Sequence, residues 1–296
     1  MIIRTCINVY AKTQGCLRVI RPQSTFATVI EQNGKAGLVL KSLSTDIYEN
    51  LAFEDWIHNH VDLQNRNILF LWRNASAVVI GRHQNPWQEC NLRLMKERGV
   101  PLARRRTDLS LLSPVLKTTC QGIKSNATPS VPSPVKNLVD EDPTLDCDTI
   151  MDAVATRYNS EFASNGSVIL VDPTDELSLP GIHKMASELE SWEWVYGKTP
   201  KFSVSTSFEV NYEASSTNVM LNMDVKNGVI EMCTIELPQD WLPKSVCTEL
   251  SEVLIGCKFC PNEVAVLTAA VLRTHPLDSE IETKMHILCQ NVTAVM

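Results

Sequence analysis

The sequence has no hydrophobic run long enough to cross a membrane and no block of like charges. None of its apolar stretches approaches the ~18 residues that a transmembrane helix requires. The formal net charge of -7 is mild for 296 residues, and no basic cluster offers a surface for nucleic acid. With 44% hydrophobic and 21% charged residues, the chain can bury a sizeable core in one large domain or two small ones. We therefore expect a globular protein without a membrane span and without nucleic acid as a partner.

Acidic residues are absent from the first thirty positions, where four basic residues precede Glu31. A basic, acid-free and moderately apolar N-terminal segment is typical of a mitochondrial transit peptide, although serine is scarcer here than in most. We therefore expect residues 1–30 to be a transit peptide and the protein to act in the mitochondrial matrix. The alternative is an ordinary basic arm.

The ten cysteines lack the paired spacing of a metal site. Only Cys257 and Cys260 form a C-x-x-C, and neither a second pair nor two histidines at matching spacing accompany them. A redox motif would need a strand–helix setting around a nucleophilic thiol. We expect reduced structural thiols and no metal.

The first part of the chain alternates predicted strands and helices. Asp46, with Glu49 three residues later, predicts a helix that begins there and ends near His60. Continuous apolar runs predict two buried strands joined by a turn, over 68–72 and 77–80. A helix containing Leu92 and Met95, ended by Gly99, and a strand over 100–103 should follow.

The middle of the chain is less regular. No element is predicted over 107–119, and four prolines between 127 and 143 exclude a long helix there. A helix should resume at Asp148, and a strand is predicted over 168–171. The inner face of that helix should carry Met151, Val154, Tyr158 and Phe162.

The segment 172–175 predicts a boundary, after which strands over 202–210, 219–225 and 229–237 form an antiparallel meander. Asn227-Gly228 suits the positive φ angles of a type I′ turn. Two helices should follow, the first opened by Pro243 and ended by Gly256. Their inner faces should carry Val246, Leu250 and Val253, then Val264, Leu267 and Val271. This gives a small α+β domain over 172–296.

Two polar segments follow predicted strands directly. One is the loop Gly81-Arg82-His83-Gln84-Asn85-Pro86-Trp87, and the other is Arg104-Arg105-Arg106. Guanidinium groups match phosphate or carboxylate oxygens two at a time, so the two segments together suit a pocket that holds an anion beside an apolar chain. Taken separately, each has a plainer interpretation, a solvated turn for the loop and a surface face for the arginines.

The sequence of these segments resembles that of the lipoate–protein ligase family, and most closely that of its mitochondrial lipoyltransferases. The resemblance rests on G-R-H-Q-N-P-W-Q-E-C-N from position 81 and L-A-R-R-R from position 102. It extends to L-A-F-E-D-W at 51–56, Q-G-I-K at 121–124, V-K-N-L at 135–138 and W-E-W-V-Y-G-K-T-P-K-F at 192–202. It implies an α+β fold, with a large mixed-sheet catalytic domain over 31–171 and an accessory domain over 172–296.

The resemblance also implies chemistry on lipoyl-AMP. The family transfers the lipoyl group to a lysine on the lipoyl domain of a 2-oxoacid dehydrogenase E2 subunit or on the glycine cleavage H protein. The lipoyl tail needs an apolar slot, and the phosphate needs cations and backbone amides. Carried onto this sequence, the candidate ligand-binding residues are Arg82, His83 and Asn85 at the lipoyl end, Arg104, Arg105 and Arg106 at the adenylate-binding loop, and Val131 and Ser133 along the adenosine.

The sequence departs from the family at its catalytic centre. Family members continue from the arginines into a glycine-rich loop of the form S-G-G-G-x-V-x-H-D, then central strands and a lysine in a D-G-x-K-I-S-G segment. Here Thr107-Asp108-Leu109-Ser110 follows Arg106, and neither motif occurs. Backbone amides of such a loop and the lysine would stabilise negative charge in the transition state. Losing one such hydrogen-bond donor lowers the rate on the order of a hundredfold to a thousandfold. We therefore predict no catalytic residue.

Neither Lys117 nor Lys124 has the small neighbours needed to replace the lost lysine. The chain is thus expected to lack central strands and to transfer weakly or not at all. Two alternatives remain, a non-catalytic module that binds lipoyl-domain partners through the C-terminal domain and an unstable product without function.

Overall fold

The structure is a computed structural model that describes residues 5–9, 18–19, 37–61, 67–105, 122–129, 138–161, 168–274 and 279–296. The predictions that concern 107–119, Arg106, Val131, Ser133 and Phe162 lie outside these residues. Within the described part, no helix is long and apolar enough to span a membrane.

The chain forms two compact units, each assembled from segments that are distant in sequence. The first unit comprises Met1–Gly81, Met95–Ser113 and Pro132–Val195, and the second comprises Arg82–Leu94, Pro114–Val131 and Tyr196–Met296.

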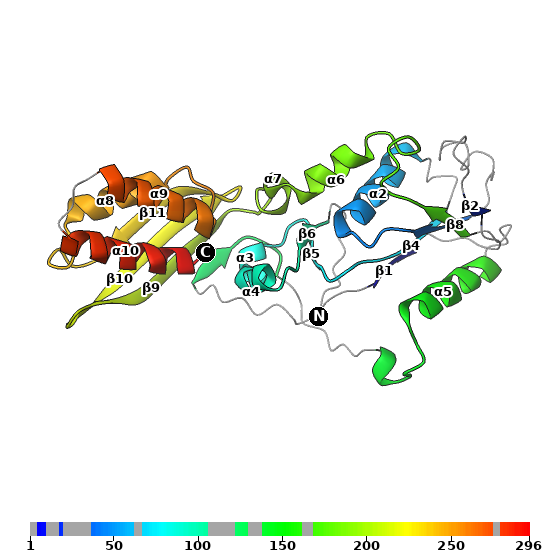
Figure 1. The fold of residues 1–296 in the computed structure, drawn as a ribbon, viewed down its shortest axis with the longest axis horizontal. Helices are drawn as coiled ribbons and strands as arrows, with labels where there is room; N and C mark the ends of the chain where they lie inside the picture. Colours follow the sequence, from blue (N-terminus) through cyan, green and yellow to red (C-terminus); the bar gives the residue numbers. More distant parts are fainter. Residues whose placement is uncertain are drawn as a thin grey trace. The chain divides into compact units, whose positions relative to one another are not determined.

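A mixed five-stranded sheet forms the centre of the first unit (Figure 1). Strand β3 pairs in parallel with β4 and β8, β2 pairs in parallel with β8, and β1 pairs antiparallel with β4. The sheet order is β1 (Thr5–Val9), β4 (Ile68–Arg73), β3 (Leu38–Ser42), β8 (Val168–Val171) and β2 (Arg18–Val19). Two segments of the expected transit peptide are thus strands here. Whether residues 1–30 are removed stays a prediction, because strand pairing does not test cleavage.

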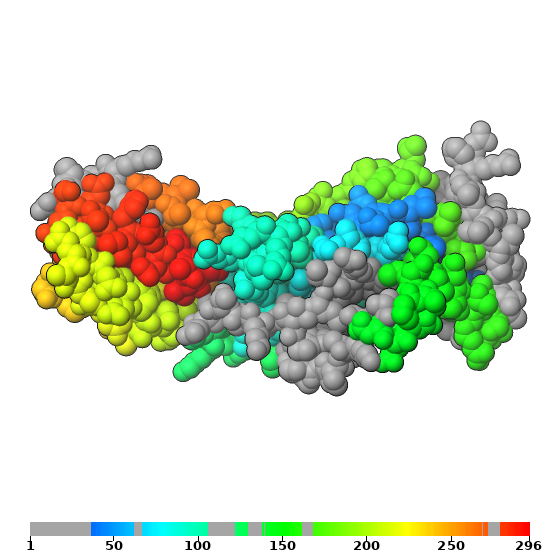
Figure 2. Space-filling model, turned by 60° about the horizontal axis from the view of Figure 1, so that its bottom comes forward, coloured from blue at the N-terminus to red at the C-terminus, as the bar shows by residue number. Residues whose placement is uncertain are grey.

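Helices cover both faces of this sheet. Helix α2 (Ile47–His60) packs on the face that carries Leu40 and Phe70, whereas α5 (Cys147–Glu161) packs on the face that carries Leu69. Because side chains alternate between the faces of a strand, the continuous apolar runs in β3 and β4 supply both cores. Helix α5 lies on the outer surface of the unit (Figure 2).

The predicted start of α2 is confirmed. The Asp46 carboxylate accepts hydrogen bonds from the backbone N–H groups of Tyr48 at 2.8 Å and Glu49 at 3.0 Å. These bonds satisfy amides that have no partner inside the helix. Helix α6 (Ile182–Glu190) packs against α2 and is followed by α7 (Trp192–Val195). Residues 172–195, which the sequence assigns to the C-terminal domain, therefore lie in the first unit.

The two predicted strands before the polar loop do not pair with each other. Strand β5 (Val78–Ile80) instead pairs in parallel with β6 (Leu102–Arg104), in a small sheet separate from β4. Helices α3 (Pro86–Glu89) and α4 (Leu92–Glu97) lie between β5 and β6 in sequence. The predicted end of α4 is confirmed, because Gly99 has a φ of +61°.

The second unit packs a four-stranded antiparallel sheet against helices (Figure 1). The predicted meander is confirmed as β9 (Phe202–Tyr212), β10 (Ser215–Lys226) and β11 (Val229–Glu236). Strand β7 (Ile123–Ser125) adds to β9. A short 3-10 helix, Leu138–Asp140, belongs to the first unit.

Three helices follow the meander, α8 (Lys244–Leu254), α9 (Pro261–Thr274) and α10 (Ser279–Ala294), where only two were predicted. The missed helix α10 buries Met285, Leu288 and Val292. Their spacing of three and four residues is the signal that could have identified it.

Two glycine positions fix the backbone of the second unit. Asn227 and Gly228 take φ angles of +52° and +72° between β10 and β11, which confirms the type I′ turn. Gly122 has a φ of +79°, and a Cβ there would lie 2.0 Å from the carbonyl oxygen of Ser205. Only glycine lets the segment before β7 approach β9 this closely.

Candidate functional site

The polar loop after β5 contains both exposed and buried side chains. Arg82 and His83 are exposed, whereas Asn85 is completely buried. The Asn85 side chain accepts a hydrogen bond from the Trp87 backbone N–H at 3.0 Å and caps α3, whose first residue is Pro86. An Asn followed by Pro is a recognised helix start. Asn85 therefore shapes the loop from within, a role that the sequence interpretation missed.

The loop is fastened to the segment around β7. The Asn85 amide Nδ2 donates to Ser125 Oγ at 3.4 Å, and the Thr128 backbone N–H donates to the His83 carbonyl oxygen at 3.1 Å. The two bonds join segments on either side of residues 106–121, which the structure does not describe. They hold His83 at a defined place in the second unit.

Trp87 anchors the loop in the core of the second unit. Its indole lies 5.3 Å from the ring centroids of Tyr196, Phe202 and Phe259, and only 3% of the residue is exposed. Tilted and edge-on pairs at this distance are favourable beyond the area that they bury. The packing of Trp87 thus fixes the position of the loop that carries Arg82 and His83.

Arg104 is completely buried in the first unit. Its Nε donates to the Val195 carbonyl oxygen at 2.8 Å, and its Nη1 donates to the Gly81 carbonyl oxygen at 3.3 Å. The Trp194 indole N–H donates to the Arg104 carbonyl oxygen at 2.7 Å. These bonds tie β6 to the last two residues of α7 and to Gly81, the residue after β5, so Arg104 organises the backbone around it.

Arg105 follows at the end of β6, with only 9% of the residue exposed. Its Nη2 forms a short ion pair with Glu54 of α2, and its buried Nε has no hydrogen-bond partner among the described residues. A buried donor without a partner costs free energy.

The predicted ligand-binding residues are divided between the two units. Arg82, His83 and Asn85 belong to the second unit, whereas Arg104 and Arg105 belong to the first. As expected, each group follows or ends a strand, and both strands, β5 and β6, belong to the first unit. Arg82 and His83 are accessible at the surface, whereas the Arg104 side chain donates hydrogen bonds to backbone carbonyl oxygens.

Comparisons with known proteins assign the family. The model of the lipoyl protein ligase A/B catalytic domain matches residues 46–108. Lipoyl amidotransferase LIPT1, mitochondrial, of Homo sapiens is 39% identical over 366 residues, covering 96% of this chain and 98% of that protein. The Mus musculus protein of the same name matches with the same identity and coverage. The chain belongs to the lipoyl amidotransferase family.

A solved structure, P. falciparum LipL1 in complex with lipoate, covers 88% of this chain and all of that chain at 21% identity. Its TM-score of 0.39 is too low to support a comparison of folds or sites.

The segment of this amidotransferase family member that matches the catalytic-domain model contains both partners of the buried ion pair. Glu54 and Arg105 lie inside 46–108, as do α2, β5 and β6. The matched segment also ends at Asp108, two residues after the last predicted arginine. Positions 106–121 lie outside the described residues.

The cysteines of this family member behave as structural thiols where they are described. Seven described cysteines form no disulfide, and the described residues contain no group of three side chains able to hold a metal. Burial raises the pKa of the Cys257 thiol above its ordinary value, and nearby Glu263 and Cys260 raise the pKa further. A raised pKa lowers the thiolate fraction, so Cys257 is a poor nucleophile.

Cys233 offers a test of this interpretation. Burial raises the pKa of Cys233 to about 11, so its thiolate fraction near pH 8 is on the order of a hundredfold lower than that of an ordinary thiol. We expect iodoacetamide to label Cys233 at least that much more slowly in the folded chain than in urea, as measured by mass spectrometry. Because the folded state favours the protonated thiol, Cys233 contributes its full share to the free energy of unfolding below its unfolded pKa of ~8.5. That share is lost as the pH rises through 11. Equal labelling rates in both states would contradict the assignment.

Proposed function

We propose that this chain derives from an enzyme that transfers the lipoyl group of lipoyl-AMP to a lysine amine, and that its transfer step is impaired. The acceptors would be the lipoyl domains of 2-oxoacid dehydrogenase E2 subunits and the glycine cleavage H protein. The observation that carries the proposal is the 39% identity to a lipoyl amidotransferase across 96% of the chain.

The impairment is supported by the length of that alignment. It spans 366 residues, whereas this chain has 296. Part of the aligned length therefore has no counterpart here. The family's glycine-rich loop and lysine segment are absent from the sequence, and we propose that they belong to the unmatched part, after Arg106.

The missing groups have a physical role in acyl transfer. Amines attack the acyl carbon of a mixed anhydride, and negative charge develops on the acyl oxygen while adenylate leaves. Backbone amides of a glycine-rich loop and a lysine ammonium would stabilise those charges. Without them, the chain could still bind parts of lipoyl-AMP while lacking the groups that lower the barrier.

The ligand-binding residues remain proposals of different weight. Arg82 and His83 are accessible and suit direct contact with the ligand, whereas the buried Arg105 pairs with Glu54 and supports the proposal less. Asn85 and Arg104 fit a positioning role, because their polar atoms already bind the protein. For Arg106, Val131 and Ser133 the proposal rests on the family resemblance alone.

The location and the domain division also remain proposals. The mitochondrial names of the human and mouse relatives support a mitochondrial location. We propose the matrix, with residues 1–30 as transit peptide. The division into a truncated catalytic domain over 31–171 and an accessory domain over 172–296 is proposed from the family resemblance, whereas the two compact units divide the chain differently and place 172–195 in the first.

A direct transfer assay tests the proposal. The purified chain, lipoyl-AMP and an apo H protein or E2 lipoyl domain would be mixed, and lipoyl-lysine would be quantified by mass spectrometry. We expect a rate at least on the order of a hundredfold below that of the human relative measured in parallel. A rate within tenfold of that relative would refute the impairment.

A second candidate is a non-catalytic module that binds lipoyl-domain partners. It is motivated by the four-stranded sheet of the second unit and by the core that its helices form with that sheet. Because Trp87 and β7 pack into that unit, the experiment should use the whole chain rather than residues 172–296. Retention of an apo lipoyl domain by the immobilised chain, without transfer, would favour this function.

A further inference from the structure

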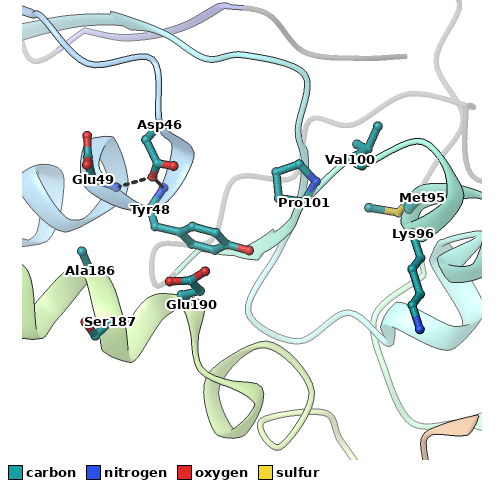
Figure 3. A pocket seen from close by; sticks show the side chains of 11 residues that line it. Asp46, Tyr48, Glu49, Met95, Lys96, Val100, Pro101, Ala186, Ser187 and Glu190 are labelled. Atoms are coloured by element: carbon teal, nitrogen blue, oxygen red, sulfur yellow. Dashed lines mark hydrogen bonds between the residues drawn. The ribbon is translucent and has the colours of Figure 1, made fainter. Parts of the chain in front are cut away.

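The first unit contains a cavity of about 530 Å³ that none of the predicted ligand-binding residues lines. It lies between the first turn of α2, the end of α4 with the following residues, and the second half of α6 (Figure 3). Its volume falls within the range of ligand-binding pockets. All of its walls belong to one unit.

The cavity is open to solvent, and its lining combines exposed polar residues with an aromatic ring and three apolar side chains. The Tyr48 hydroxyl donates a hydrogen bond to the Leu102 carbonyl oxygen at 3.0 Å, which fixes the ring. The Tyr48 ring lies on one side of the hollow, and Met95, Val100 and Pro101 lie on the other (Figure 3). An aliphatic chain between these walls would lose water on both sides.

The charges around the cavity are mostly negative. Three lining residues, Asp46, Glu49 and Glu190, are acidic, and one, Lys96, is basic. The Asp46 carboxylate already accepts two backbone N–H groups at the start of α2, and the Glu49 carboxylate accepts the Ser44 hydroxyl, so Glu190 is the carboxylate that these bonds do not engage. Glu190 is the last residue of α6 and lies close to the Tyr48 ring (Figure 3). The carbonyl end of α6 adds further negative potential at the same place.

We propose that this cavity binds a lysine or arginine side chain of a partner polypeptide. Such a side chain combines an aliphatic stem, which suits the walls, with a cationic end group, which suits Glu190. A cation over the face of a tyrosine gains further attraction. The hydrogen bond that fixes the Tyr48 ring reduces the entropy lost on binding.

The test uses the whole chain with ¹³C-methyl-labelled methionine, so that the Met95 methyl group reports from inside the cavity. The probe is the acetylated and amidated peptide Gly-Gly-Lys-Gly-Gly, and its control carries norleucine in place of lysine. We expect the lysine peptide to shift the Met95 resonance with a dissociation constant in the millimolar range. The norleucine peptide should bind at least tenfold more weakly.

Variants on one helix give a matched comparison. Glu190→Gln should weaken binding of the lysine peptide about threefold to fivefold, the effect of losing one exposed ion pair. Glu188→Gln should leave binding unchanged, because Glu188 does not line the cavity and pairs with Lys184 instead. Tyr48→Leu should weaken binding to a similar degree as Glu190→Gln. Neither peptide binding nor its test requires acyl transfer.

Three results would overturn the inference. The first is a Met95 resonance that the lysine peptide leaves unmoved. The second is equal binding of the lysine and norleucine peptides, or equal effects of Glu190→Gln and Glu188→Gln. The third is tighter binding of free 1,5-diaminopentane than of the peptide, which would assign the cavity to small amines.

Discussion

Arg104→Met is expected to lower the free energy of unfolding by about 2 to 3 kcal/mol. Methionine fills the space of the side-chain stem but leaves the Val195 and Gly81 carbonyl oxygens without their donor. Hydrogen bonds to a charged group contribute about 1.5 to 3 kcal/mol each. Removing a buried charge also removes its desolvation penalty, so the net loss is smaller than the sum of the two bonds.

Arg82→Met is the matched control, since both arginines belong to the predicted ligand-binding set. Arg82 is exposed, so its replacement should change the free energy of unfolding by less than about 0.5 kcal/mol. Urea unfolding followed by circular dichroism measures both. If the two variants unfold at the same urea concentration, Arg104 does not organise the backbone as described.

Trp87→Ala is expected to cost about 3 to 5 kcal/mol, a larger effect than that of Arg104→Met. The indole contacts three aromatic rings of the second unit and is almost completely buried. Its removal leaves a cavity that the surrounding strands and α3 cannot fill by small shifts.

His83→Ala, in the same loop, separates this packing effect from a general effect of changing the loop. His83 is exposed and joins the structure through its backbone carbonyl oxygen, which the substitution retains. We expect its thermal midpoint to match that of the unchanged chain, while Trp87→Ala melts well below it. Similar midpoints for the two variants would show that the aromatic cluster does not anchor the loop.

Elements whose causes are local were predictable. The Asp46 cap fixed the start of α2, and Asn227-Gly228 fixed the turn between β10 and β11, because each depends on only a few neighbouring residues. The same reasoning would have identified α10 from the spacing of Met285 and Leu288. That omission was an error of interpretation rather than a limit of the sequence.

Features that depend on partners distant in sequence were not predictable. Strand β5 pairs with β6 rather than with β4, and β7 joins β9 across about eighty intervening residues. Nothing in the local pattern shows that Arg104 is buried by Val195 and Gly81 while Arg82 is exposed. The motif identified the family, whereas the individual roles of its residues depend on tertiary contacts.

The most direct test of impaired transfer restores the segment that the chain lacks. The residues that the human relative carries between the counterparts of Arg106 and Gln121 would be inserted in place of residues 107–120. Lipoyl transfer to an apo H protein would then be measured for the present chain and for the insertion variant. We expect the insertion to raise the transfer rate by at least on the order of a hundredfold. A well-folded insertion variant that transfers no faster than the present chain would contradict the proposed cause of the impairment.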